Sequence, residues 1–262
     1  MQNKKLTKDN IITLALALIF ILTLSILFIV YKDNVLNALE KNFIRNENYK
    51  ELFKGLLNTF LITLVAFIAG IILGIAVCLA EGIKSENVFV ILLKKICSIY
   101  VAIFRGTPAT VQLLIIYFVI FASYRGDALY IAMLAFGLNS GAYVSEIIRG
   151  GINAVPKGQM EAGRSLGLSY AAVMKKIIFP QAIRNALPSL GNEFIALIKE
   201  TSIVGFIGAI DLTLAFRKIA GGTYDYMTVY LTMGVVYFII VFIIATVLNK
   251  IERKLIHNAY NK

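Results

Sequence analysis

The sequence predicts an all-α integral membrane protein with about six transmembrane helices. Hydrophobic residues make up 59% of its 262 residues, and the mean hydropathy is +0.79. Only 16% of the residues are charged, against roughly 25% in soluble domains. Several stretches of about 20 residues carry no charge, which is the length an α-helix needs to cross a bilayer. These observations exclude an ordinary soluble enzyme, a disordered chain and a fibrous protein.

The six expected spans differ in how clearly the sequence marks them. Three stretches contain no charged residue at all: 11–31, 56–80 and 226–249. The other three are bordered or interrupted by charge or proline: 106–124 with a backward extension through Ser98–Phe104, 128–145, and 182–208. The last of them is the weakest, because it carries Glu193, Lys199 and Glu200.

The first span has the length of a membrane helix rather than of a cleavable signal. Its apolar core exceeds the 7–15 residues of a signal peptide, and no A-x-A site follows it. We therefore interpret 11–31 as a retained signal anchor.

The net charge of +11 predicts an orientation rather than a nucleic-acid partner. With six spans both termini lie on one side, and that side receives most of the basic residues; in membrane proteins it is the cytoplasmic side. We expect these residues there: Lys4, Lys5, Lys8, Lys84, Lys94, Lys95, the basic residues from Arg149 to Arg184, Lys250, Arg253, Lys254 and Lys262. Cys78, Cys97 and the single His257 form no disulfide or metal-binding pattern.

The segment 149–180 is too polar to enter lipid and too long for a simple turn. Pro156 suits the first turn of a helix over 157–166, and Gly167 is placed to end it. Ser169 can cap a second helix, 170–179, which Pro180 ends or kinks. From the pattern alone, two interpretations are open: a plug for a groove in another protein, or a helix lying on anionic lipid.

The residues of this segment resemble a known motif. Glu161-Ala162-Gly163, three residues, Gly167, nine residues and Ile177-Ile178-Phe179-Pro180 are similar to the EAA loop of bacterial ABC-importer permeases, usually written E-A-A, three residues, G, nine residues, I-x-L-P. Gly163 and Phe179 depart from that form by conservative changes.

The resemblance extends over about 52–255 and points to the polar amino-acid branch, the histidine/glutamine/arginine permeases. It rests on these further stretches: Arg105-Gly106-Thr107-Pro108 with Gln112, Asn139–Tyr143, Glu146, Arg149–Ile152, Val155–Gln159, Pro180–Arg184, Leu187-Pro188, Gly191-Asn192 and Lys199–Ser202. It implies a permease core at 51–255 with the cytoplasmic coupling loop at 149–180, and five helices in that core. Residues 1–50 then hold a cytoplasmic tip, an extra helix and an external segment, and 256–262 a cytoplasmic tail.

The resemblance implies that the loop docks on a separate cytoplasmic ATPase. The expected coupling residues are Gly158, Glu161, Ala162, Gly163, Gly167 and Pro180. Ala162 and Gly163 would permit close approach to the partner, and Gly167 would allow a sharp turn. Glu161 would contact the ATPase or, alternatively, only cap its own helix.

Polar residues at membrane depth are functional candidates because they are costly there. We expect a substrate path lined by Gln112, Asn139, Glu146, Asn192, Lys199 and Glu200. A purely structural pairing of Lys199 stays open, and the sequence around Arg105 also suits a turn at the membrane edge. The pairs Gly70/Gly74 and Gly137/Gly141 are expected to pack helices closely.

The chain carries no G-x-x-x-x-G-K-[ST] loop and no catalytic or metal-ligand cluster in its spans. We therefore expect a transport subunit with no cofactor of its own, and ATP and magnesium on the partner ATPase. The resemblance implies an ATP-driven importer of a polar amino acid in a bacterial inner membrane, working by alternating access. Its expected partners are the ATPase dimer, an extracellular or periplasmic binding protein, a second permease subunit of the same or a related sequence, and lipid. The alternatives are an ion-gradient-driven carrier or channel, and a non-transporting scaffold.

Overall fold

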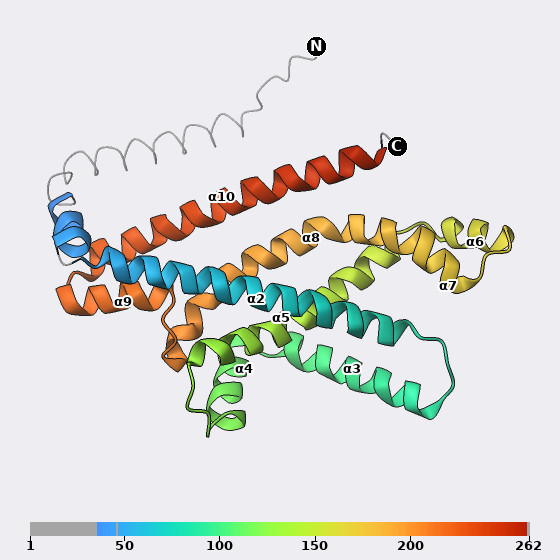
Figure 1. The fold of residues 1–262 in the computed structure, drawn as a ribbon, viewed down its shortest axis with the longest axis horizontal. Helices are drawn as coiled ribbons and strands as arrows, with labels where there is room; N and C mark the ends of the chain where they lie inside the picture. Colours follow the sequence, from blue (N-terminus) through green and yellow to red (C-terminus); the bar gives the residue numbers. More distant parts are fainter. Residues whose placement is uncertain (1–35, 46, 261–262) are drawn as a thin grey trace, which may run out of the picture.

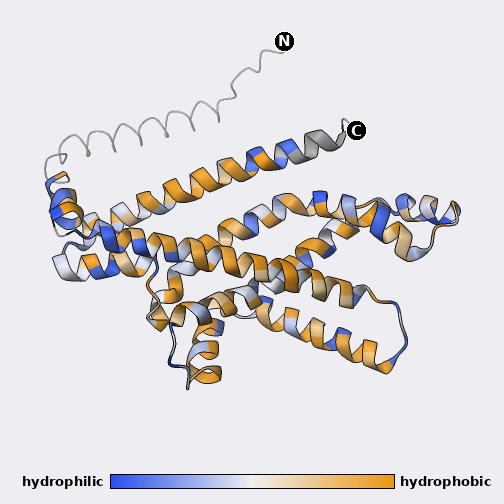
Figure 2. Ribbon diagram, viewed as in Figure 1, coloured by the Kyte–Doolittle hydropathy of each residue, from blue (hydrophilic) through white to orange (hydrophobic). Residues whose placement is uncertain are grey.

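Long helices run between the two ends of the molecule and carry most of its apolar residues (Figures 1 and 2). The computed structural model describes residues 36–45 and 47–260. Within these residues the long helices are α2 (Tyr49–Gly82), α3 (Val88–Gly106), α5 (Ala128–Asn153), α8 (Phe179–Glu200) and α10 (Tyr226–Tyr260). Shorter elements join them: η1 (Glu40–Arg45), α4 (Ala109–Ile115), η2 (Ile116–Ile120), α6 (Lys157–Ser165), α7 (Tyr170–Val173), η3 (Met174–Ile178), η4 (Thr201–Ile207) and α9 (Leu212–Thr223). The described part of the chain contains helices and no strands, as the sequence predicts.

The expected spans at 56–80, 128–145 and 226–249 are confirmed. Helices α2, α5 and α10 are each long and apolar enough to cross a membrane. The expected span at 182–208 is divided between α8 and the 3₁₀-helix η4. The expected span at 11–31 lies outside the described residues.

The expected span at 106–124 is not one helix. Helix α3 ends at Gly106, Thr107 is extended (φ −127°, ψ 151°), and α4 begins again at Ala109. The cause is Pro108, because a proline disfavours helical backbone at the residue before it. Residues 109–120 form only a short apolar helix after the break. Helix α3, which carries Lys94, Lys95 and Arg105, is not among the described helices apolar enough to cross a membrane.

The two ends of the bundle are formed by different elements (Figure 1). One end holds α6, α7, the α2–α3 connection and the C-terminal end of α10; the other holds η1, α9 and the first turns of α2 and α10. The first we call the coupling end and the second the far end.

Helices α2 and α5 form the centre of the fold and approach each other through glycine. A Cβ atom on Gly70 would lie 2.7 Å from Ser140 Oγ, and one on Gly74 would lie 2.6 Å from Val144 Cγ1. Such distances leave no room for a side chain. The expected role of Gly70 and Gly74 in close packing is thus confirmed.

Replacing Gly74 with valine is expected to destabilise the detergent-solubilised protein by about 1–3 kcal/mol, because three extra carbons must fit against Val144. Thermal unfolding should show a midpoint lowered by several degrees. The matched control is Gly221→Val on α9, where a Cβ atom would have nothing within 4 Å. Equal midpoints for the two variants would contradict the packing argument.

Candidate functional site

At the coupling end, α6 and α7 form a helical hairpin that reverses at Gly167. Gly167 has φ +81°, a left-handed conformation that favours glycine. Its N–H donates to Arg164 O at 3.0 Å, and Leu168 N–H donates to Gly163 O at 3.2 Å, the bond pair of a Schellman motif. Ser169 then caps α7, its Oγ accepting from Ala172 N–H at 3.2 Å. The predicted helix, turn, cap and second helix are all present.

The second helix of the hairpin does not end at Pro180. It continues through the π-helix η3 into α8, with Phe179 N–H donating to Met174 O and Pro180 near the start of α8. A π-helical turn accommodates the missing proline N–H within a continuous helical segment. The loop is therefore rigidly joined to the long helix α8.

Gly163 faces inward rather than toward a partner. A Cβ atom there would lie 2.8 Å from Val173 Cγ2 and 3.3 Å from Ile177 Cδ1. These side chains belong to a small apolar core that includes Val155 and Ile178. Gly163 therefore does not lie at a surface where it could permit close approach to the ATPase, as we expected. Its small size instead lets α6 and α7 pack on each other.

The outward face of the hairpin carries the remaining loop residues of the motif. Gly158, Glu161 and Ala162 are exposed, and Leu166 beside them is 82% exposed. Glu161 lies beyond the first turn of α6, whose cap position is Pro156 with no side-chain hydrogen bond. The described part of the chain shows no capping role for Glu161, so its carboxylate remains available on the surface.

Two of the expected path residues, Gln112 and Asn139, bind each other. Asn139 Nδ2 donates to Gln112 Oε1 at 2.8 Å, and both side chains are buried. Gln112 Nε2 in turn lies 2.9 Å from the carbonyl oxygens of Phe104 and Thr107. These carbonyls are left free where α3 breaks. The pair thus fastens the break between α3 and α4 to α5.

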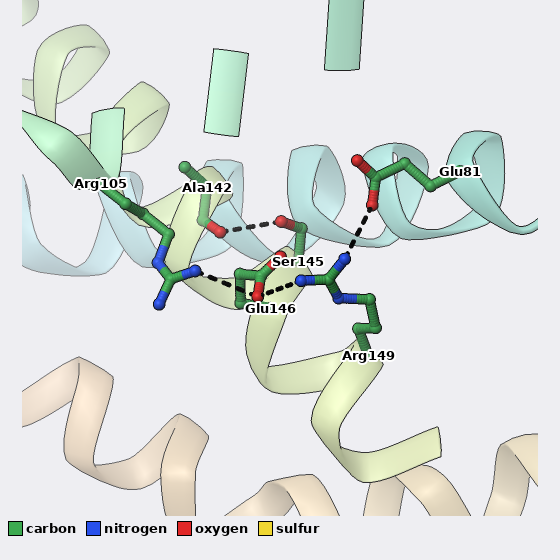
Figure 3. Close-up of polar contacts among 6 residues, drawn as sticks. All are labelled: Glu81, Arg105, Ala142, Ser145, Glu146 and Arg149. Carbon is green, nitrogen blue, oxygen red and sulfur yellow. Dashed lines mark hydrogen bonds and ion pairs between the residues drawn. The ribbon is translucent and has the colours of Figure 1, made fainter. Parts of the chain in front are cut away.

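Glu146 lies at the centre of a charged cluster between α3 and α5 (Figure 3). Its Oε2 is 3.1 Å from Arg105 Nη1 and 2.5 Å from Arg149 Nη2. Arg149 also reaches Glu81 of α2 at 3.9 Å. The Arg105 guanidinium lies over the Tyr143 ring, 5.7 Å from its centroid. The cluster places charges of both signs within a few ångströms of each other.

A polar cavity of about 480 Å³ opens beside this cluster. Arg105, Tyr143 and Glu146 line one side, and Asn185 and Ser189 of α8 line the other. The cavity joins the end of α3 with the coupling-end halves of α5 and α8. It is large enough for a small polar molecule and presents a cation, an anion and neutral hydrogen-bonding groups.

The other expected path residues do not meet at this cavity. Asn192 lines an apolar groove between α2, α8 and α10, and Lys199 lines a separate pocket with Tyr237 and Phe238. Glu200 is half-buried at the end of α8. The seven-residue spacing of Asn185, Asn192 and Lys199 thus gives one face of α8 but not one cavity, because different helices cover that face along its length.

Two further polar contacts were not expected. Glu193 Oε1 accepts from Ser140 Oγ at 2.8 Å and links α8 to α5. The pairing of Arg105 with Glu146 joins residues far apart in the sequence, so spacing on one helix gives no sign of it. The spacing of Glu146 and Arg149, three residues apart on α5, does indicate their pairing.

Comparisons with known proteins identify the family of this chain. Residues 66–257 match the family model of the binding-protein-dependent transport system inner membrane component. The arginine transport system permease protein ArtQ of Bacillus subtilis is 39% identical over 209 residues, 79% of this chain and 93% of that protein. A putative glutamine transport system permease protein GlnP of Rickettsia typhi is 39% identical, over 79% of this chain and 94% of its own length.

Solved structures show the same fold. A crystal structure of an amino acid ABC transporter with histidines superposes with a TM-score of 0.73 at 37% identity, covering 79% of this chain and 95% of the other. The MetNI methionine ABC transporter gives a TM-score of 0.65 at 20% identity, which supports the fold alone. The chain is a multi-pass membrane protein and belongs to the family of binding-protein-dependent transport system inner membrane components.

Proposed function

We propose that this chain is the permease subunit of an ATP-driven importer for a polar amino acid. The observation that carries the proposal is the α6–α7 hairpin, a rigid element that exposes Glu161 and Ala162 at one end of the bundle and continues into α8. Relatives named as arginine, glutamine and L-cystine permeases support the substrate class. The hairpin would pass the motion of a cytoplasmic ATPase to α8 and so to the cavity that α8 lines.

The hairpin's exposed face predicts a specific uncoupling variant. Glu161→Arg is expected to lower ATP-dependent uptake at least about tenfold. The reason is that a reversed charge at a docking surface costs several kcal/mol of association free energy. Since Glu161 is exposed, the thermal unfolding of the isolated subunit should not change. The measurement is the amount of ATPase that copurifies with the variant.

The matched control is Glu86→Arg, in the connection between α2 and α3. The α2–α3 connection lies at the same end of the molecule (Figure 1), and Glu86 within it is exposed and lies outside the hairpin. It should retain the ATPase. Unchanged copurification with Glu161→Arg would contradict the docking role of this face.

The charged cavity suits a zwitterion. An amino acid carries a carboxylate and an ammonium group, and Arg105 and Glu146 offer a donor and an acceptor on the same cavity wall. Asn185 and Ser189 add neutral hydrogen-bonding groups on the opposite wall. A bound amino acid would share these groups with the Arg105–Glu146 pair, which makes the cavity a segment of the substrate path.

Orientation and partners follow from the same proposal. The coupling end, with the hairpin and the C-terminal end of α10 (Figure 1), would face the cytoplasm, and its basic residues agree with that side. ATP and magnesium would be bound by the ATPase dimer and not by this chain. A substrate-binding protein would deliver the amino acid at the far end, and a second permease subunit would complete the path.

Reconstituted transport tests the proposal. The subunit is purified from its native membrane with its partners and placed in liposomes, and uptake of radiolabelled polar amino acids is followed with ATP on the hairpin side. Uptake that requires ATP supports an importer. Uptake driven by an ion gradient without an ATPase would identify a secondary carrier instead, and no uptake of any amino acid would favour a scaffold.

A further inference from the structure

Helix α10 presents an apolar face that the rest of the described chain leaves uncovered. It packs chiefly on α8 and α9, and none of the residues in its most apolar stretch is buried, in contrast to 67% for α5. Five exposed side chains follow one another along one side of the helix, each between 57% and 77% exposed: Met227, Leu231, Val235, Phe238 and Phe242. Of these, Phe238 also borders the pocket that Lys199 lines. We call these five residues the α10 stripe.

The N-terminal part of the chain is fastened beside the start of this stripe. Phe43 of η1 is buried and meets the Phe216 ring edge-on, at 6.0 Å between centroids. Asn42 Nδ2 donates to Asp225 Oδ2 at 2.8 Å, and Asp225 Oδ1 accepts from Thr228 N–H in the first turn of α10 at 3.0 Å. The described chain therefore begins, at residue 36, close to the first turn of α10 at the far end of the bundle.

The charge on Asp225 strengthens this attachment. Its partial burial acts to raise the pKa of the carboxyl, but hydrogen bonds from Thr228 and Asn42 and the nearby Lys41 outweigh burial and hold the pKa below its usual value. At neutral pH the carboxylate is ionised, so the bond from Asn42 is to a charged acceptor, which is stronger than a neutral one.

We propose that the charge-free segment 11–31 crosses the membrane antiparallel to α10 and packs on the α10 stripe. Only the residues 32–35 separate the segment from the described chain, and four residues span at most about 14 Å. At about 1.5 Å per residue the segment makes a helix about 30 Å long, which matches the stripe together with the apolar turns that follow it. The segment thus starts next to one end of α10 and has the length to follow it.

The tether decides between this segment and other occupants. Inside a bilayer apolar side chains gain little by leaving lipid, so helix association depends on packing and proximity. A tethered segment has an effective concentration that a separate second subunit does not have. Gly234, between Leu231 and Phe238 on the same side of α10, has nothing within 4 Å of a would-be Cβ atom and leaves a hollow for a side chain of the segment.

The relatives make this segment an addition rather than part of the shared core. They match 92% to 99% of their own lengths but at most 85% of this chain, and the family model begins only at residue 66. The segment therefore serves this chain as a brace for α10. The inference does not depend on which molecule is transported or on which end faces the cytoplasm.

Disulfide trapping in the full chain tests the contact. In a background with Cys78→Ala and Cys97→Ala, Val235→Cys is combined in turn with Leu22→Cys, Thr23→Cys, Leu24→Cys and Ser25→Cys. These four successive positions cover every side of a helix at the depth that an antiparallel register places opposite Val235. The matched control replaces Val235→Cys by Ile99→Cys on α3, which is 56% exposed.

We expect an intramolecular disulfide with Val235→Cys for at least one of the four positions, and none with Ile99→Cys, because a disulfide requires Cα atoms within about 7 Å. No bond to Val235→Cys, a bond of equal yield to Ile99→Cys, or bonds only between two chains would overturn the proposal.

Photo-cross-linking from a benzoyl-phenylalanine in place of Phe238 is a second test of the contact that needs no cysteine. Mass spectrometry after illumination identifies what covers the α10 stripe. A cross-linked peptide from 11–31 of the same chain is the expected product, and chains of two different masses expressed together distinguish it from a peptide of a second copy. An adduct with lipid alone, or with a second chain alone, would overturn the proposal.

Discussion

Replacing Gly167 with valine is expected to lower ATP-dependent uptake at least about tenfold while the protein still inserts in the membrane. Gly167 has φ +81°, and a β-branched residue there costs at least about 1–2 kcal/mol. The hairpin can relieve this strain only by giving up the bonds from the Gly167 and Leu168 N–H groups to Arg164 and Gly163. The angle between α6 and α7 then changes, and with it the surface presented to the ATPase. Uptake and copurified ATPase are the two measurements.

A graded series separates backbone strain from lost contact. Asparagine tolerates the left-handed conformation better than other residues with a side chain, so Gly167→Asn should keep clearly more uptake than Gly167→Val. A Cβ atom at Gly167 meets nothing within 4 Å, so crowding does not explain a loss. Gly82→Val, at the coupling end and equally open, should transport normally. Full uptake by Gly167→Val would show that the turn has no part in coupling.

The hairpin is the part of the site that the sequence predicts best. Its turn, its cap and the start of its first helix depend on local chemistry: a glycine that accepts a positive φ, a serine that caps and a proline before α6. Such effects act over a few residues, so spacing along the chain is enough to place the first boundary at Pro156, the turn and the cap. Spacing does not show that the helix continues through Pro180 into α8. Spacing also misses the inward role of Gly163, because Val173 and Ile177 meet it only after the hairpin has closed.

The polar residues of the spans are predicted less well. The sequence predicts that Gln112, Asn139 and Glu146 line a substrate path. In the structure Glu146 lines the charged cavity, whereas Gln112 and Asn139 are buried and bind each other. The sequence alone does not indicate which of them bind one another. Gln112 and Asn139 satisfy a helix break made by Thr107 and Pro108, so the break in the expected span and the two buried amides have one cause. A prediction that treats 106–124 as one helix misses both the break and the pairing of the two amide side chains.

Charge-free stretches of the sequence predict helices α2, α5 and α10, but no such stretch marks α3. Lys94, Lys95 and Arg105 interrupt α3, so a search for apolar stretches passes over it. Arg105 is tolerated because Glu146 on α5 and the Tyr143 ring receive it. A helix that carries charge in this way is recognised as part of the bundle only when its partners on other helices are known.

The second large expected effect concerns Glu146, whose carboxylate pairs with Arg105. Glu146→Gln is expected to lower uptake about 10- to 100-fold, because a hydrogen bond to a charged group contributes about 1.5–3 kcal/mol. The amide keeps the size of the side chain but no longer offers an anion to the substrate's ammonium group. It also leaves Arg105 and Arg149 without the carboxylate that they share.

The neutral double variant separates the two causes. If Glu146 serves only to hold Arg105, then Arg105→Gln combined with Glu146→Gln removes the unpaired charge and should restore uptake. If both residues line the substrate path, the double variant should unfold at a higher temperature than Glu146→Gln alone yet still fail to transport. We expect the second result, since both side chains line the cavity.

Glu81→Gln is the matched control for this series. Glu81 also pairs with Arg149, at 3.9 Å, and its side chain is as exposed as that of Glu146, at 20%, but it does not line the cavity. Its uptake should therefore change by less than about threefold, since a weak, partly exposed ion pair contributes under about 1 kcal/mol. An equal loss in Glu81→Gln and Glu146→Gln would assign the cluster to helix packing alone. A selective loss at Glu146 would place the amino acid beside the Arg105 guanidinium, at the point where α3, α5 and α8 meet.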